Sequence, residues 1–132
     1  MVATFLIANA SGTSETCAPV RLKPLHCICG KLMDIPGDPV GHGKVTVFKQ
    51  GAKTVEAPAG DDGEFLIGGL KEENYELQVE ASGFKPFRFS IHLVKPEKKC
   101  KQEIEVVLTL GYPENCTRVR LVKAKADRSF RD

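Results

Sequence analysis

Residues 75–93, YELQVEASGFKPFRFSIHL, carry the pattern that decides the fold of this chain. In residues 75–81, and again in residues 87–93, apolar and polar side chains alternate one by one. The apolar positions are Tyr75, Leu77, Val79, Ala81, Phe87, Phe89, Ile91 and Leu93. Because successive side chains of a β-strand point to opposite faces, each half predicts a strand with one buried and one solvated face. Ser82-Gly83 between the two halves predicts a turn.

The same alternation extends in both directions along the chain. It predicts further strands at residues 27–32, 44–47, 53–57, 64–67, 102–110 and, shorter, 119–121. Turn formers separate these strands, and Asp61-Asp62-Gly63 carries the Asp-Gly signal of a tight hairpin. No window of about 11 residues shows the apolar stripe of an amphipathic helix. The sequence therefore predicts an all-β fold, a single antiparallel two-sheet β-sandwich of about seven to eight strands.

Composition excludes several classes of protein. A chain of 132 residues has room for one hydrophobic core. Its 19 basic and 17 acidic residues nearly balance, which argues against a nucleic-acid binder. No stretch approaches the ~20 apolar residues of a membrane-spanning helix, so no integral membrane span is expected. Tryptophan is absent and aromatic residues make up only 7%, which disfavours a large aromatic platform for sugars.

The chain divides into three regions. Residues 1–25 form an N-terminal segment, residues 26–124 the sandwich, and residues 125–132 a basic C-terminal tail. Residues 2–8 are apolar except for Thr4, and Ala8-Asn9-Ala10 follows at the end of this run. This pattern resembles the end of a secretory signal, although no Lys or Arg precedes the run. We therefore expect residues 1–10 to be the remnant of a signal peptide, and a mobile apolar arm is the alternative. Five cysteines in so short a chain also favour an oxidising compartment, so the expected location is extracellular or periplasmic.

Five cysteines also leave at least one outside any intramolecular pair. Cys100 and Cys116 flank one predicted strand, and we expect a disulfide between them. Cys17 would then reach Cys27 or Cys29.

A soft-metal site is the alternative use of these sulfurs. Cys27 and Cys29 are two apart on a strand, so both thiols point to one face, close to His26. Structural zinc sites need four ligands, commonly in pairs with C-x2–4-C spacing, and no second pair follows. We therefore predict no metal and no cofactor.

Several short motifs resemble one known family. In chain order they are Ile28–Asp34, Gly37–Val40, Asp62–Phe65, Tyr75–Val79 and Ala81–Phe84. Together they resemble the carboxypeptidase regulatory-like domain over about residues 26–110. The resemblance implies a Greek-key, transthyretin- or prealbumin-like sandwich of the kind that accompanies metallocarboxypeptidases, outer-membrane receptors, adhesins and carbohydrate-active proteins, usually without catalytic function. Asn74 departs from the family pattern, which has glycine before the tyrosine, and asparagine would keep a turn with positive φ there.

Catalytic motifs are missing from the sequence. It contains no G-x-S-x-G elbow, and the carboxylate pairs Asp61-Asp62 and Glu72-Glu73 are simpler as turn formers than as glycosidase residues. The aspartates of the loops would at most begin a calcium site, which needs six to eight oxygen ligands. These aspartates are Asp34, Asp38, Asp61 and Asp62.

The remaining candidates for function form a ligand surface. Its residues are His42, Lys85, Arg88, His92 and Tyr112. We expect a non-catalytic exported module that serves as a protein-interaction or structural accessory at the cell envelope. The expected partner is an envelope or extracellular protein. A carbohydrate-binding module with a glycan partner is the alternative, and a hydrolase is a distant third.

Overall fold

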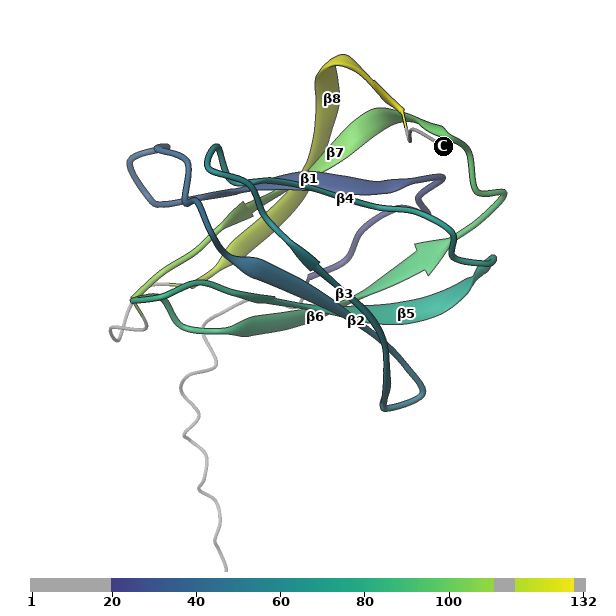
Figure 1. Cartoon of the computed structure of the whole chain (residues 1–132), viewed down its shortest axis with the longest axis horizontal. Coiled ribbons are helices and arrows are strands. Elements are labelled where there is room, and N and C mark those ends of the chain that lie inside the picture. The colour runs from purple at the N-terminus through teal and green to yellow at the C-terminus, as the bar shows by residue number, and fades with distance from the viewer. Residues whose placement is uncertain (1–19, 111–115, 130–132) are drawn as a thin grey trace, which may run out of the picture.

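Two four-stranded sheets pack face to face in the computed structural model, which describes residues 20–110 and 116–129 (Figure 1). Side chains are described up to residue 124. Sheet I has the order β4 (Glu64–Ile67), β1 (Ile28–Met33), β7 (Lys99–Val107) and β8 (Arg118–Ser129). Sheet II has the order β3 (Ala52–Pro58), β2 (Lys44–Lys49), β5 (Glu73–Glu80) and β6 (Phe87–Leu93). The predicted all-β sandwich is confirmed.

The strand pairing departs from the prediction at one place. Neighbouring strands are antiparallel except β1 and β7, which run parallel, with Gly30 opposite Ile104. Between β6 and β7 the chain crosses from sheet II to sheet I, so no hairpin sets the direction of β7 relative to β1. Parallel partners need such a crossover connection.

No helix in the part of the chain that the structure describes is long and apolar enough to cross a membrane.

The predicted hairpin at Asp61-Asp62-Gly63 is wrong. The turn itself forms, because Gly60 N donates to Glu64 O at 2.9 Å and Gly63 N donates to Gly60 O at 3.0 Å. However, β3 lies in sheet II and β4 in sheet I, so the turn carries the chain from one sheet to the other. A Cβ on Gly63 would lie 2.5 Å from the Leu32 carbonyl oxygen, so glycine is needed for this close crossing.

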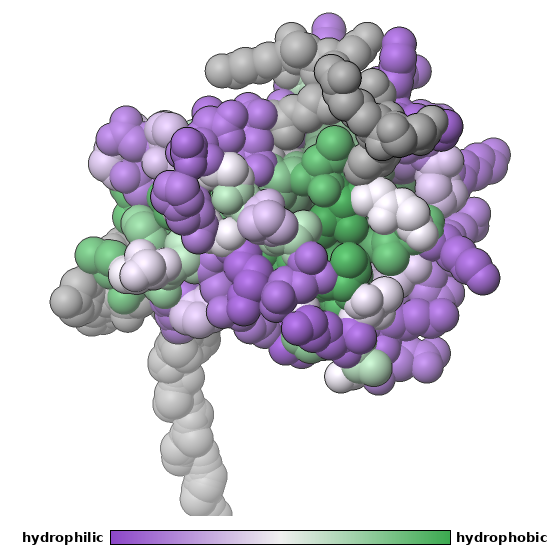
Figure 2. Space-filling model, viewed as in Figure 1, coloured by the Kyte–Doolittle hydropathy of each residue, from purple (hydrophilic) through white to green (hydrophobic). Residues whose placement is uncertain are grey.

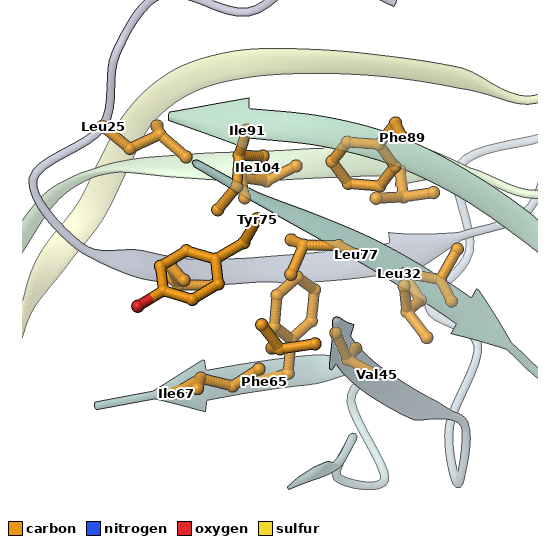
Figure 3. Packing of buried hydrophobic residues seen from close by; sticks show 14 of the residues in the cluster. Leu25, Leu32, Val45, Phe65, Ile67, Tyr75, Leu77, Phe89, Ile91 and Ile104 are labelled. Atoms are coloured by element: carbon orange, nitrogen blue, oxygen red, sulfur yellow. The ribbon is translucent and has the colours of Figure 1, made fainter. Parts of the chain in front are cut away.

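The core fills the space between the sheets (Figure 3). The side chains predicted to face inward on β5 and β6 do so, and Figure 2 shows the hydrophobic strip between the two sheets. The fully buried residues of the core include Ile28, Leu32, Val45, Val47, Leu77, Val79, Ile104, Val106 and Leu108. Leu110, which the alternation also placed inside, is 58% exposed because β7 ends at Val107.

Glycine in the middle of β1 allows close packing in sheet I. A Cβ on Gly30 would overlap the carbonyl oxygen of Ile104 and lie 2.6 Å from Cζ of Phe65. The Phe65 ring therefore fills the space that a side chain at residue 30 would need.

The segment before β1 and the last strand, β8, both extend the packed part of the chain beyond the predicted sandwich. Leu25 is 2% exposed, donates its N–H to His92 O and accepts from Val94 N, so the N-terminal segment packs beside β6. The eighth strand was predicted to be short, and this is wrong, because β8 spans 12 residues. It continues to Ser129, within the range 125–132 that the sequence assigns to a tail. Residues 1–10, predicted to be a signal remnant, lie outside the described residues.

Candidate binding surface

The outer face of sheet II carries polar and charged side chains around the half-buried Phe48, and we call this set the charged face. On β5 and β6 alternate side chains are buried in the core, so the side chains between them point outward. The register places Lys44 and Phe48 of β2 opposite the outward Glu80 and Glu76 of β5. The charged face consists of Lys44, Phe48, Lys53, Glu56, Glu76, Gln78, Glu80 and Arg88. It crosses all four strands from β6 to β3.

Arg88 on β6 is the centre of the contacts at one end of this face. Its Nε and one terminal nitrogen donate to Gln78 Oε1 at 3.0 and 2.7 Å. Its other terminal nitrogen lies 3.4 Å from Glu76 Oε1. The guanidinium carbon lies 4.0 Å from the centroid of the Phe48 ring. Arg88 therefore covers the half-buried Phe48 and is held over it by two partners on β5.

The contacts continue to the opposite edge of the sheet. Gln78 Nε2 donates to Glu80 Oε2 at 2.6 Å. Lys44 Nζ lies 4.0 Å from Glu80 Oε1 and 3.3 Å from Glu56 Oε2. Lys53 Nζ lies 3.3 Å from the same Glu56 oxygen. Side chains from four strands thus form one chain of contacts, in which acidic and basic groups alternate.

Two ammonium groups act on Glu56. Hydrogen bonds from Lys44, and then from Lys53, hold the pKa of the Glu56 carboxyl below its ordinary value of 4.5. Glu56 is exposed, so solvent screens these interactions and they order the side chains more than they stabilise the fold.

A hollow of about 750 Å³ adjoins the charged face where the N-terminal segment meets β5 and β6. Its lining includes Arg21, Phe48, Asn74 and His92. His92 Nδ1 is hydrogen-bonded to Asn74 Oδ1 across the β5–β6 pair. Asn74 was predicted to sit in a turn with positive φ, which is wrong, because it lies within β5 and its side chain is exposed beside His92.

The predicted ligand surface is not one surface. Arg88 and His92 share the outer face of β6, as the alternation indicated. Lys85 is exposed in the loop before β6, where its backbone N–H donates to Thr109 O at 2.8 Å. His42 lies in a different loop, with a φ of 61° and its Nε2 3.1 Å from Asp61 Oδ1. Tyr112 lies outside the described residues.

The predicted Cys100–Cys116 disulfide is wrong. Cys100 is bonded to Cys27, with the two Cα atoms 5.3 Å apart. This pairing also excludes the proposed bond from Cys17 to Cys27. Cys116 takes part in a disulfide as well, whereas Cys29 is a buried thiol. Cys17 lies outside the described residues.

The position of Cys100 coincides with an irregularity in strand pairing that the sequence does not reveal. Gln102 lies opposite Lys123, whereas Cys100 lies opposite Arg128, so the register of β7 and β8 shifts between Cys100 and Gln102. Regular alternation along a strand does not continue through such an irregularity. Cys100 lies on the outer face of sheet I with Cys27 and Cys29, although uninterrupted alternation from Ile104 would place it inside.

Only one group of side chains in the described part of the chain has the arrangement of metal ligands, and it is Cys27, Cys29 and Cys100. His26, which the sequence placed near these sulfurs, is exposed and donates from Nδ1 to Val94 O at 2.8 Å.

Asp34, one of the aspartates considered for a calcium site, acts as a turn former, since its Oδ1 accepts from the backbone nitrogens of Gly37 and Asp38.

Comparisons with known proteins identify the family and the fold of this chain. The model of the carboxypeptidase regulatory-like domain matches residues 28–109. Among solved structures, Klebsiella pneumoniae 5-hydroxyisourate hydrolase is similar, with a TM-score of 0.53 and 12% identity over 76% of this chain and 100% of that chain. At this identity the likeness confirms the predicted transthyretin-like fold and nothing more. A search of curated proteins finds no match. Because the family match covers well over half of its residues, this chain belongs to the carboxypeptidase regulatory-like domain family.

Proposed function

We propose that this chain is a non-catalytic interaction module, exported to the cell envelope or beyond, that binds a protein partner through the charged face of sheet II. The observation that carries the proposal is the position of Arg88 over Phe48. Sugar sites commonly use an exposed aromatic ring for stacking, and the guanidinium occupies that position here. The face offers instead an ordered array of charges, which suits recognition by a complementary protein surface.

The sign pattern of the charged face indicates the kind of partner. Its three basic side chains and three acidic side chains alternate along the contacts. Such a face carries no strong net field, so it favours a partner with a matching mixed pattern over a polyanion.

Two further observations support a non-catalytic role and export of the protein. The three histidines lie in separate places, each with its own partner: Val94 O for His26, Asp61 for His42 and Asn74 for His92. A nucleophilic mechanism needs a base held beside its nucleophile, and none of these pairs provides that, which favours a non-catalytic role. The Cys27–Cys100 disulfide fits the oxidising compartment that export would reach.

Co-sedimentation with cell-envelope fractions tests the proposal. Purified oxidised protein should pellet with the envelope, and soluble glycans should not compete. Protease treatment of the envelope should abolish pelleting, because the partner is a protein. Pelleting that a glycan abolishes would replace this proposal with the carbohydrate-binding alternative, and absence of pelleting would overturn it.

Arg120 provides a matched control for Arg88. It is also an exposed arginine on an edge strand, with its Nε 2.7 Å from Glu105 Oε1, but it belongs to sheet I. Arg88→Ala should weaken pelleting at least tenfold, whereas Arg120→Ala should leave it unchanged. Equal loss in both variants would show that general charge, and not the charged face, drives the association.

A further inference from the structure

Three sulfur atoms meet on the outer face of sheet I, opposite to the charged face. The sulfurs of Cys27, Cys29 and Cys100 all lie within 4.8 Å of one another, and the partly buried Leu66 packs against them. Cys27 and Cys100 form the disulfide, and the Cys29 thiol donates to Gln102 O at 3.3 Å. A thiol therefore lies beside a disulfide, close to both of its sulfurs.

Accessibility distinguishes the three cysteines. Cys29 and Cys100 are 0% exposed, whereas Cys27 is 7% exposed. Two hollows, of about 270 and 180 Å³, are both lined by Cys27 and His26. A small molecule that enters either hollow therefore meets Cys27, and neither Cys29 nor Cys100 lines them.

The larger hollow has a cationic lining. Lys99 and Lys101, which flank Cys100 in β7, line it together with Glu97. Its lining thus holds two lysine ammonium groups and one carboxylate. Cationic surroundings stabilise a thiolate and attract anionic reagents.

We propose that Cys29 and the Cys27–Cys100 disulfide form a thiol–disulfide exchange site at which Cys27 reacts with anionic low-molecular-weight disulfides. In the first step the Cys29 thiolate attacks Sγ of Cys100. The Cys29–Cys100 bond forms, the Cys27–Cys100 bond breaks, and Cys27 leaves as a thiolate. The proton lost from Cys29 is replaced on Cys27, so the step needs no oxidant or reductant.

In the second step the Cys27 thiolate attacks a small disulfide, R–S–S–R, in the cationic hollow. A mixed disulfide between Cys27 and one R–S group forms, and the other R–S group leaves as a thiolate that takes up the proton. The small disulfide is the oxidant, and the protein thiol is oxidised. The exchange thus transfers reactivity from the buried Cys29 to the one sulfur of the cluster that outside molecules reach.

Oxidised glutathione, an anionic peptide disulfide, is the probe that tests this site. The folded protein is incubated with it, quenched with acid and mapped by mass spectrometry without reduction. The expected product carries glutathione on Cys27 and a Cys29–Cys100 disulfide. An adduct on Cys29 with Cys27–Cys100 intact, or no adduct unless the protein is unfolded, would overturn the proposal.

Three comparisons sharpen the test. Cys29→Ser keeps the Cys27–Cys100 disulfide and should form no adduct. Cystamine, a cationic disulfide, should modify Cys27 several-fold more slowly than oxidised glutathione, and Lys99→Ala/Lys101→Ala should remove that difference. Because Cys29→Ser could disturb packing, Cys27→Ala provides an independent readout. When it is refolded under oxidising conditions, it should contain a Cys29–Cys100 disulfide, because all three sulfurs of the cluster lie within 4.8 Å of one another. Persistence of both thiols after oxidative refolding would contradict the exchange.

Discussion

The guanidinium carbon of Arg88 lies 4.0 Å from the centroid of the Phe48 ring, on strands that are separated in sheet II by β5. The stem of Arg88 spans the outer face of β5, while Gln78 and Glu76 on that strand fix its head group. The Arg88 side chain thus contacts residues on two neighbouring strands, β5 and β2, and covers the ring of Phe48, the aromatic residue of the charged face. This contact determines both the stability and the binding chemistry expected of the charged face.

Arg88→Ala should lower the free energy of unfolding modestly. A cation–π contact at an exposed site contributes roughly 0.5–1 kcal/mol, and the hydrogen bonds to Gln78 add to it. Urea denaturation should therefore show a loss of about 1 kcal/mol, with Arg88→Lys intermediate because lysine keeps the charge but not the planar fork. Arg120→Ala, which removes an exposed ion pair without a ring contact, should cost less. An equal loss for the two alanine variants would mean that Phe48 contributes nothing.

Gly30→Ala adds only one methyl group, but it should lower the free energy of unfolding strongly. The added Cβ would overlap the Ile104 carbonyl oxygen, which belongs to the β1–β7 pair, so backbone and not only the Phe65 ring must move. Overpacking of this kind typically costs 1–3 kcal/mol, and we expect about 3 kcal/mol in thermal or urea unfolding.

Gly60→Ala is the control for this substitution. The nearest atom to its added Cβ is Asp62 Oδ1, at 3.3 Å, which belongs to a side chain that can move. Its effect should stay below about 1 kcal/mol. A similar loss at both glycines would show that chain entropy, and not the contact with Ile104, sets the cost.

The strands could be predicted from sequence because burial on one face leaves period-two alternation. Glu64–Ile67 and Phe87–Leu93 match the predicted strands residue for residue. Sheet membership could not be predicted. The Asp-Gly turn specifies local backbone geometry, but β4 pairs with β1 and not with β3 through contacts distant in sequence, such as the hydrogen bond from Leu32 N to Gly63 O.

The candidate sites were predicted only where one strand is enough to define them. The outward positions of Arg88 and His92 follow from alternation within β6. The partnership of Arg88 with Phe48 depends on the register of three strands, which no local pattern contains. Likewise, the register of β7 and β8 shifts beside Cys100, which is bonded to Cys27, so the cysteine spacing alone indicated the wrong disulfide.

Acid should loosen the β3 side of the charged face. The pKa of Glu56 is lowered in the folded protein by hydrogen bonds from Lys44 and Lys53. A carboxyl with a depressed folded pKa stabilises the fold at pH values above its unfolded pKa, and this contribution is lost as the pH falls through the folded pKa. The loss therefore occurs below the ordinary value of 4.5. NMR titration of the Glu56 carboxyl should give a midpoint below that value.

Lys44→Ala/Lys53→Ala provides the control for this titration. Without the two ammonium groups, the midpoint of Glu56 should return to its ordinary value. A midpoint that does not change in the double variant would show that these lysines do not act on Glu56 in solution.

Loss of Cys100 should destabilise the protein more than loss of either Cys27 or Cys29. The Cys27–Cys100 bond joins residues 73 apart, and closing a loop of this length contributes about 4 kcal/mol in the chain-entropy treatment. Cys100→Ser removes both disulfides of the cluster that would close this long loop, so urea unfolding should show a loss of that order. Cys27→Ala allows Cys29 to bond Cys100 across nearly the same loop and should lose clearly less after oxidation. Cys29→Ser keeps the original bond, and its hydroxyl can still donate to Gln102 O. If Cys27→Ala and Cys100→Ser lose equal stability under oxidising conditions, Cys29 does not replace Cys27 in the folded protein.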